Sequence, residues 1–153
     1  MSNISGKGSR VLVYIDEYNR LRIASEAEET WRSSSPVGGG SYLKIEVVKQ
    51  EYRGGRSYFY NMEPAPLSVD LDGDGVEEIV VPQNQLDGHL GVVFRGPAGY
   101  RFQSINSGFG GTITGLGAIP GENPPTLIIA VVRFNNNWLK SSGETQIIMT
   151  TGE

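Results

Sequence analysis

The sequence contains no cysteine and only one histidine, His89, among its 153 residues. Without thiols, the chain can form no disulfide, no thiolate metal site and no cysteine nucleophile. A single histidine cannot build a zinc site from several histidines, and no GxSxG motif offers a serine for His89 to activate. The sequence therefore predicts no catalytic residue, and we expect a protein that is not an enzyme.

Long apolar runs and basic clusters are also missing. No run approaches the roughly 18 residues that a transmembrane helix requires, and residues 1–8 lack the apolar core of a secretion signal. The net charge is −4, and residues 61–153 carry four Lys and Arg against ten Asp and Glu. No basic stripe with interleaved aromatic residues occurs. We therefore expect neither membrane insertion nor a nucleic-acid partner.

Glycine, in contrast, is abundant, with 21 residues, and eight prolines punctuate short β-branched and aromatic runs. This composition is typical of many short strands joined by turns. The length suits one domain with a substantial core. We therefore predict a single all-β domain over residues 1–153.

An acidic loop with two glycines precedes the β-branched run Ile79–Val81. Asp70, Asp72 and Asp74 alternate along the loop, and Glu78 follows directly before the run. Calcium takes six to eight oxygen ligands at about 2.3–2.6 Å, and carboxylates this close repel one another unless a cation is present. We predict a Ca²⁺ site with these ligands: Asp70, Asp72, Asp74, the Val76 carbonyl and Glu78.

The adjacent carboxylates Glu77 and Glu78 are expected to behave differently. Successive side chains of a strand point to opposite faces. We therefore expect Glu78 to turn towards the metal while Glu77 faces solvent.

The spacing of the acidic loop differs from that of an EF-hand. An EF-hand loop that began at Asp70 would place its bidentate glutamate at position 12, which is Val81 here. A DxDxDGxxE loop that opens a strand resembles the calcium loop of FG-GAP and VCBS repeats, the blades of integrin-α-like β-propellers. Phe109-Gly110 and Gly117-Ala118 resemble two further landmarks of these repeats, although Ile119 stands where the family has proline. The alternative is a surface turn rich in Asp and Gly that binds no metal.

The chain also matches itself. At a shift of 48 residues, Ile79–Val81 aligns with Leu127–Ile129, and a third copy begins at Arg10–Ile15. Each copy has the pattern of a meander of three or four short strands, as in a propeller blade. We predict blade-like units over residues 9–40, 64–110 and 111–153, of which only the second carries an intact calcium loop.

The segment between the first two units fits no repeat. Two β-prone runs surround Gly54-Gly55, which predicts an inserted hairpin over residues 42–62. Aromatic residues beside arginines are favoured at binding hot spots. The residues predicted to contact a partner are Tyr52, Arg53, Arg56, Tyr58 and Tyr60. The alternative is that one face of the hairpin packs on the core and the arginines are solvated.

The expected fold is all-β with propeller-like, antiparallel meander blades. Three blades are fewer than the four to eight that typically close a propeller. The chain is therefore expected to be a fragment of a larger propeller, to pair with a second copy, or not to form a closed propeller.

The family resemblance implies adhesion or ligand recognition by an exported or surface-exposed protein. We expect an extracellular, cell-surface or periplasmic module that binds structural calcium and recognises a protein or carbohydrate. Two alternatives remain open. One is a fragment of a propeller enzyme that acts on glycans, and the other is a structural subunit that assembles through open blade edges.

Overall fold

All regular secondary structure in the described part of the chain is β-strand, which confirms the all-β prediction. The structure is a computed structural model and describes residues 1–5, 10–25, 28–39, 42–47, 56–61, 63–84, 87–105, 108–119, 121, 124–137 and 140–151. Within these ranges, no helix is long and apolar enough to cross a membrane.

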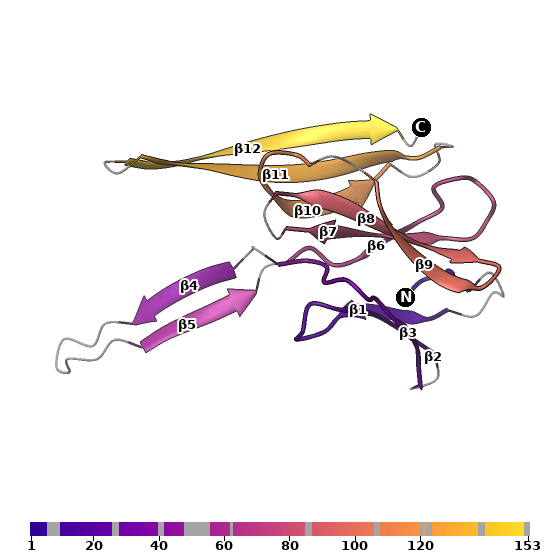
Figure 1. Ribbon diagram of the computed structural model, residues 1–153. Helices are drawn as coiled ribbons and strands as arrows, with labels where there is room; N and C mark the ends of the chain where they lie inside the picture. The colour runs from indigo at the N-terminus through magenta and orange to yellow at the C-terminus, as the bar shows by residue number, and fades with distance from the viewer. Residues whose placement is uncertain are drawn as a thin grey trace.

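The strands form three antiparallel meanders and a separate hairpin (Figure 1). The first sheet has the order β1-β2-β3, the second β6-β7-β8-β9 and the third β10-β11-β12, while β4 pairs with β5. The bounds are β1 Leu12–Ile15, β2 Leu21–Ser25, β3 Glu28–Arg32, β4 Tyr42–Val47, β5 Arg56–Asn61, β6 Leu67–Val69, β7 Glu78–Gln83, β8 His89–Gly96, β9 Gly99–Ser104, β10 Thr112–Ala118, β11 Thr126–Asn137 and β12 Lys140–Thr151. None of these sheets closes on itself. The propeller arrangement and its blade boundaries stay predictions.

The second sheet lies between the other two, and β7 contributes to a core on each side (Figure 1). On one side, Ile79 and Val81 share a core with Leu21 of the first sheet. On the other side, Val80 shares a core with Ile129 of the third sheet. Successive residues of a strand face opposite ways, and both faces of β7 pack against a core. The centre of β7 is therefore a continuous apolar run without polar alternation. The acidic loop therefore leads directly into a strand that is buried on both faces.

Hydrogen bonds at the end of β7 join all three sheets. The Asn84 N–H donates to the carbonyl of Gly38, which follows the first sheet. The Asn84 side chain donates to the carbonyl of Ile113 in the third sheet and accepts a bond from the N–H of Ile113, both at 2.9 Å. Asn84 is only 7% exposed. This one amide therefore satisfies both backbone groups of a buried residue on another sheet.

The β4–β5 hairpin projects from the side of the stack (Figure 1). Its two strands pair antiparallel from Tyr42 opposite Asn61 to Val47 opposite Arg56. This pairing agrees with the hairpin expected over residues 42–62, whose turn lies outside the described residues.

Candidate metal centre

The acidic loop connects β6 to β7 and turns back tightly on itself. Gly73 and Gly75 have φ angles of +77° and +86°, a backbone conformation that glycine adopts without steric cost. At the base of the loop, Val69 pairs with Glu78 across the antiparallel ladder. The glycines and the ladder together bring the first and last acidic residues of the loop to the same end of the sheet.

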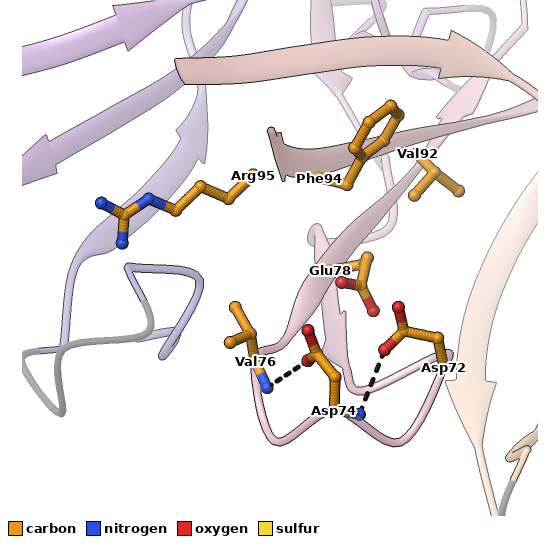
Figure 2. Close-up of a pocket in the computed structure, with 7 residues that line it drawn as sticks. All are labelled: Asp72, Asp74, Val76, Glu78, Val92, Phe94 and Arg95. Carbon is orange, nitrogen blue, oxygen red and sulfur yellow. Dashed lines mark hydrogen bonds between the residues drawn. The ribbon is translucent and has the colours of Figure 1, made fainter. Parts of the chain in front are cut away.

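A pocket of about 470 Å³ opens beside the loop (Figure 2). Carboxylates from the loop form one side of it, and β8 forms the other. Figure 2 shows the Arg95 side chain extending away from the carboxylates. The residues that line the pocket are Asp72, Asp74, Val76, Glu78, Val92, Phe94 and Arg95. Four of the five predicted metal ligands therefore border one open space.

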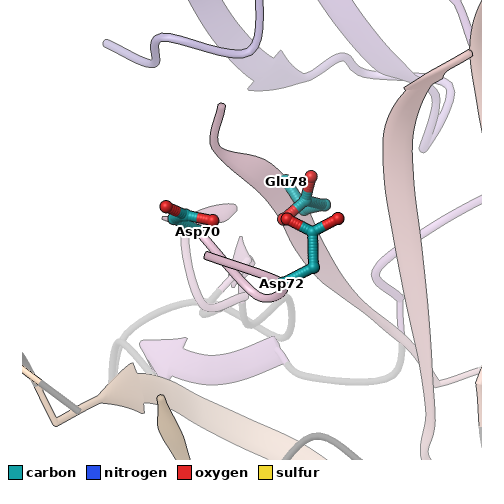
Figure 3. Close-up of side chains that lie close together, drawn as sticks. All are labelled: Asp70, Asp72 and Glu78. Atoms are coloured by element: carbon teal, nitrogen blue, oxygen red, sulfur yellow. The ribbon is translucent and has the colours of Figure 1, made fainter. Parts of the chain in front are cut away.

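Three of the predicted carboxylates converge (Figure 3). Asp70, Asp72 and Glu78 each offer one oxygen, and these oxygens all lie within 4.8 Å of one another. Oxygens on opposite sides of one calcium ion are about 4.6–5.2 Å apart, so this spacing suits ligands of a single cation. Asp74 is not a member of this group, and it lies at the pocket with Val76. The cluster can therefore hold a metal ion.

Backbone N–H groups hold Asp70 and Asp72 in position. Asp70 accepts hydrogen bonds from Gly73 at 2.7 Å and from Gly75 at 3.0 Å. Asp72 Oδ1 accepts one from the N–H of Asp74 at 3.1 Å. An ionised carboxylate offers about four lone-pair sites, so both side chains keep capacity for a cation. These backbone hydrogen bonds therefore orient both carboxylates within the loop.

Glu78 is the buried member of the cluster, with only 8% of the residue exposed. Its Oε2 accepts a hydrogen bond from the N–H of Leu71 at 2.8 Å. Burial, aided by the charges of the three loop aspartates, raises the pKa of Glu78 although the bond from Leu71 opposes this change. A cation among these oxygens would favour the ionised form of Glu78 instead.

Glu77 does not face solvent, and the prediction for this residue is wrong. β7 begins at Glu78, so the alternation of a strand does not govern Glu77. Its Oε2 accepts hydrogen bonds from Ser2 Oγ at 3.1 Å, the Asn3 N–H at 2.7 Å and Ser68 Oγ at 2.6 Å. Burial alone raises the pKa of Glu77, but these bonds outweigh burial and lower it. Glu77 therefore ties the N-terminal segment to the base of the loop.

The hairpin residues predicted to contact a partner are only partly described. Tyr58 and Tyr60 are 44% and 54% exposed, and they share one face of β5 because they are two residues apart. Arg56 begins β5, while Tyr52 and Arg53 lie outside the described residues. The role of this surface stays a prediction.

Comparison of the chain with protein-family models, curated proteins and solved structures finds no significant match. The resemblance to FG-GAP and VCBS repeats therefore stays a prediction from the loop and the repeat pattern. The geometry defines a class of site, namely a cluster of three carboxylates that can hold a metal ion on an all-β scaffold.

Proposed function

We propose that this protein is a non-catalytic, calcium-binding module of the β-propeller type that recognises a protein or carbohydrate ligand. In this proposal the calcium ion is structural, and the protein works at the cell surface, outside the cell or in the periplasm. The observation that carries the proposal is the convergence of Asp70, Asp72 and Glu78, whose oxygens lie within 4.8 Å of one another.

The donor chemistry favours calcium over softer metals. The cluster offers only carboxylate oxygens, which suit hard cations, whereas zinc and copper sites use imidazole or thiolate ligands. Calcium also accepts a larger and less regular set of oxygens than magnesium does. Asp74 and the Val76 carbonyl are the further ligands that we propose.

A structural role follows from the place of the loop in the chain. The loop joins β6 to β7, and β7 supplies side chains to both cores. A cation bound by Asp70 and Glu78 would hold the two ends of this loop together. Ion binding would therefore stabilise the folded state without taking part in a reaction.

Two further features of the molecule support a propeller-type recognition module. Three consecutive antiparallel meanders with cores between them resemble the packing of neighbouring propeller blades. The projecting hairpin carries exposed Tyr58 and Tyr60, and tyrosine is enriched among residues that dominate binding energies.

Thermal unfolding with calcium and with excess chelator tests the metal site. A ligand at a hundredfold excess over its Kd stabilises the folded state by about 2.7 kcal/mol. For a chain of this size we expect calcium to raise the Tm by about 5–10 °C. Asp72→Asn should lose this response, whereas Glu17→Gln, which removes an exposed charge outside the loop, should keep it. An equal Tm for the wild type in calcium and in chelator would refute the calcium site, and an equal rise with magnesium would refute the choice of ion.

A glycan array probed with and without calcium tests recognition. We expect the wild type to retain a defined set of glycans and the double variant Tyr58→Ala/Tyr60→Ala to lose them while its circular dichroism stays unchanged. Equal binding by the double variant would show that the hairpin is not the recognition surface. The absence of any retained glycan would contradict carbohydrate recognition.

A further inference from the structure

The third sheet has one face in the core and one face in solvent. Its inner face packs on the second sheet through Ile113, Ile129 and Val131, which are fully buried. On β11 and β12, Phe134 is 69% exposed, and Ile147 and Met149 are each 59% exposed. In Figure 1 this sheet lies at one end of the stack.

The strand register places these exposed side chains on one face. Ala130 lies opposite Ile147 and Ile128 lies opposite Met149, and paired residues of antiparallel strands share a face. β10 adds Gly115, opposite Ala130, to the same face. We call this surface the outer face. Its described residues are Thr112, Gly115, Gly117, Thr126, Ile128, Ala130, Val132, Phe134, Gly143, Thr145, Ile147, Met149 and Thr151.

None of these outer-face residues carries a charge, although the whole chain has a net charge of −4. The charged residues nearby, Arg133 and Glu144, oppose each other in the register and belong to the inner face of the same hairpin. An uncharged, apolar surface of this kind is typical of an interaction site. A second copy can therefore approach this face without meeting like charge among its described residues.

The opposite end of the stack has a different chemistry. The open face of the first sheet carries the exposed Leu12 and Tyr14 beside the charged Arg22, Arg32 and Glu29. Arg22 forms ion pairs with Glu29 and with Asp16, the second at 2.6 Å. This surface therefore mixes charged and apolar side chains, whereas the described residues of the outer face carry no charge.

We propose that the outer face binds the outer face of a second copy of this chain, which gives a closed, twofold symmetric dimer. A twofold interface places the same patch on both sides, so a charged patch would repel itself and an uncharged one does not. The two third sheets would pack face to face at the usual separation of about 10 Å. Phe134, Ile147 and Met149 would then be buried by their counterparts.

Mass measurement by sedimentation equilibrium across a dilution series tests this dimer. Ile147→Glu introduces a charge on the outer face, and Gln146→Glu introduces the same charge on the other side of the same strand. Both positions are exposed, so neither change disturbs a core, and circular dichroism verifies the fold. We expect the wild type and Gln146→Glu to reach twice the chain mass, and Ile147→Glu to dissociate at least tenfold more readily.

Three results would overturn the proposal. A single-chain mass for the wild type at every concentration would mean that a second copy does not cover the outer face. Equal dimerisation of Ile147→Glu and Gln146→Glu would place the contact elsewhere, for example at the free edge of β12. A mass that keeps growing beyond two chains would indicate an open stack. The series is run both with calcium and with chelator, because the outer face contains no residue of the acidic loop and the dimer should form in both.

Discussion

Glu77 gathers three hydrogen-bond donors on one carboxylate oxygen, and two of them come from residues 2 and 3 at the start of the chain. Its neighbour Glu78 belongs to the carboxylate cluster with Asp70 and Asp72. The two adjacent glutamates therefore have different surroundings, because Glu77 fixes the N-terminal segment and Glu78 belongs to the group of carboxylates that can hold a metal ion.

We predict that Glu77→Ala lowers the free energy of unfolding by about 1–2 kcal/mol, since the donors of Ser2, Asn3 and Ser68 lose their acceptor. Folding lowers the pKa of Glu77, so the stability from this group is present above its ordinary value of 4.5 and is lost as the pH falls through the folded-state pKa. The difference in the free energy of unfolding between wild type and variant should therefore shrink in acid. Urea unfolding at pH 7 and pH 3, with chelator throughout, measures this difference.

The exposed Glu144→Ala serves as the control for this experiment and should show little change at either pH. A gap between wild type and Glu77→Ala that stays constant from pH 7 to pH 3 would contradict the ionised role of Glu77.

The last residues of β7 join elements that are far apart in the chain. Asn84 bonds to both backbone groups of Ile113, which is completely buried in the third sheet. Its neighbour Gln83 makes one side-chain bond, to the carbonyl of Pro36 at 3.2 Å. The end of β7 therefore links neighbouring parts of the fold by side-chain hydrogen bonds. The Asn84 amide makes two of these bonds to Ile113, and the Gln83 amide makes one to Pro36.

We predict that Asn84→Ala destabilises the protein by at least about 2 kcal/mol, because an unpaired buried polar group costs about 1–3 kcal/mol and two such groups are left on Ile113. Gln83→Ala should cost less than about 1 kcal/mol, since its partner lies in a half-buried segment. Chemical denaturation of both variants gives the comparison. Equal losses in the two variants would show that the bonds to Ile113 are not the source.

At the scale of the whole molecule, the second sheet packs against a core on each of its two faces. Ile79 lies in the core with the first sheet, and Val80 lies in the core with the third sheet. Since adjacent residues of β7 serve different cores, the sheets should unfold together and not one by one.

We predict that Ile79→Ala lowers the stability by about 2–5 kcal/mol. In a Trp138→Phe background, the fluorescence of Trp31 reports on the first sheet, because Trp31 packs against its core. Far-ultraviolet circular dichroism reports on all strands. The two unfolding curves should have the same midpoint, and a fluorescence midpoint that shifts alone would show that the first sheet unfolds independently.

The sequence by itself determined what depends on near neighbours in the chain. The β-branched run after the acidic loop predicts β7, the pair Gly54-Gly55 predicts a hairpin, and alternating aspartates on a glycine turn predict converging carboxylates. Strand propensity, turn geometry and loop closure act within about ten residues, so a pattern in the chain can reveal them.

Only the tertiary structure decided which groups meet across long separations. Glu77 finds donors 74 and 75 residues away, and Asn84 finds Ile113 at a separation of 29. Whether an apolar strand face is buried or open, as on the two sides of the third sheet, depends on which sheet packs against it. These outcomes follow from packing between sheets, for which spacing along the chain carries no signal.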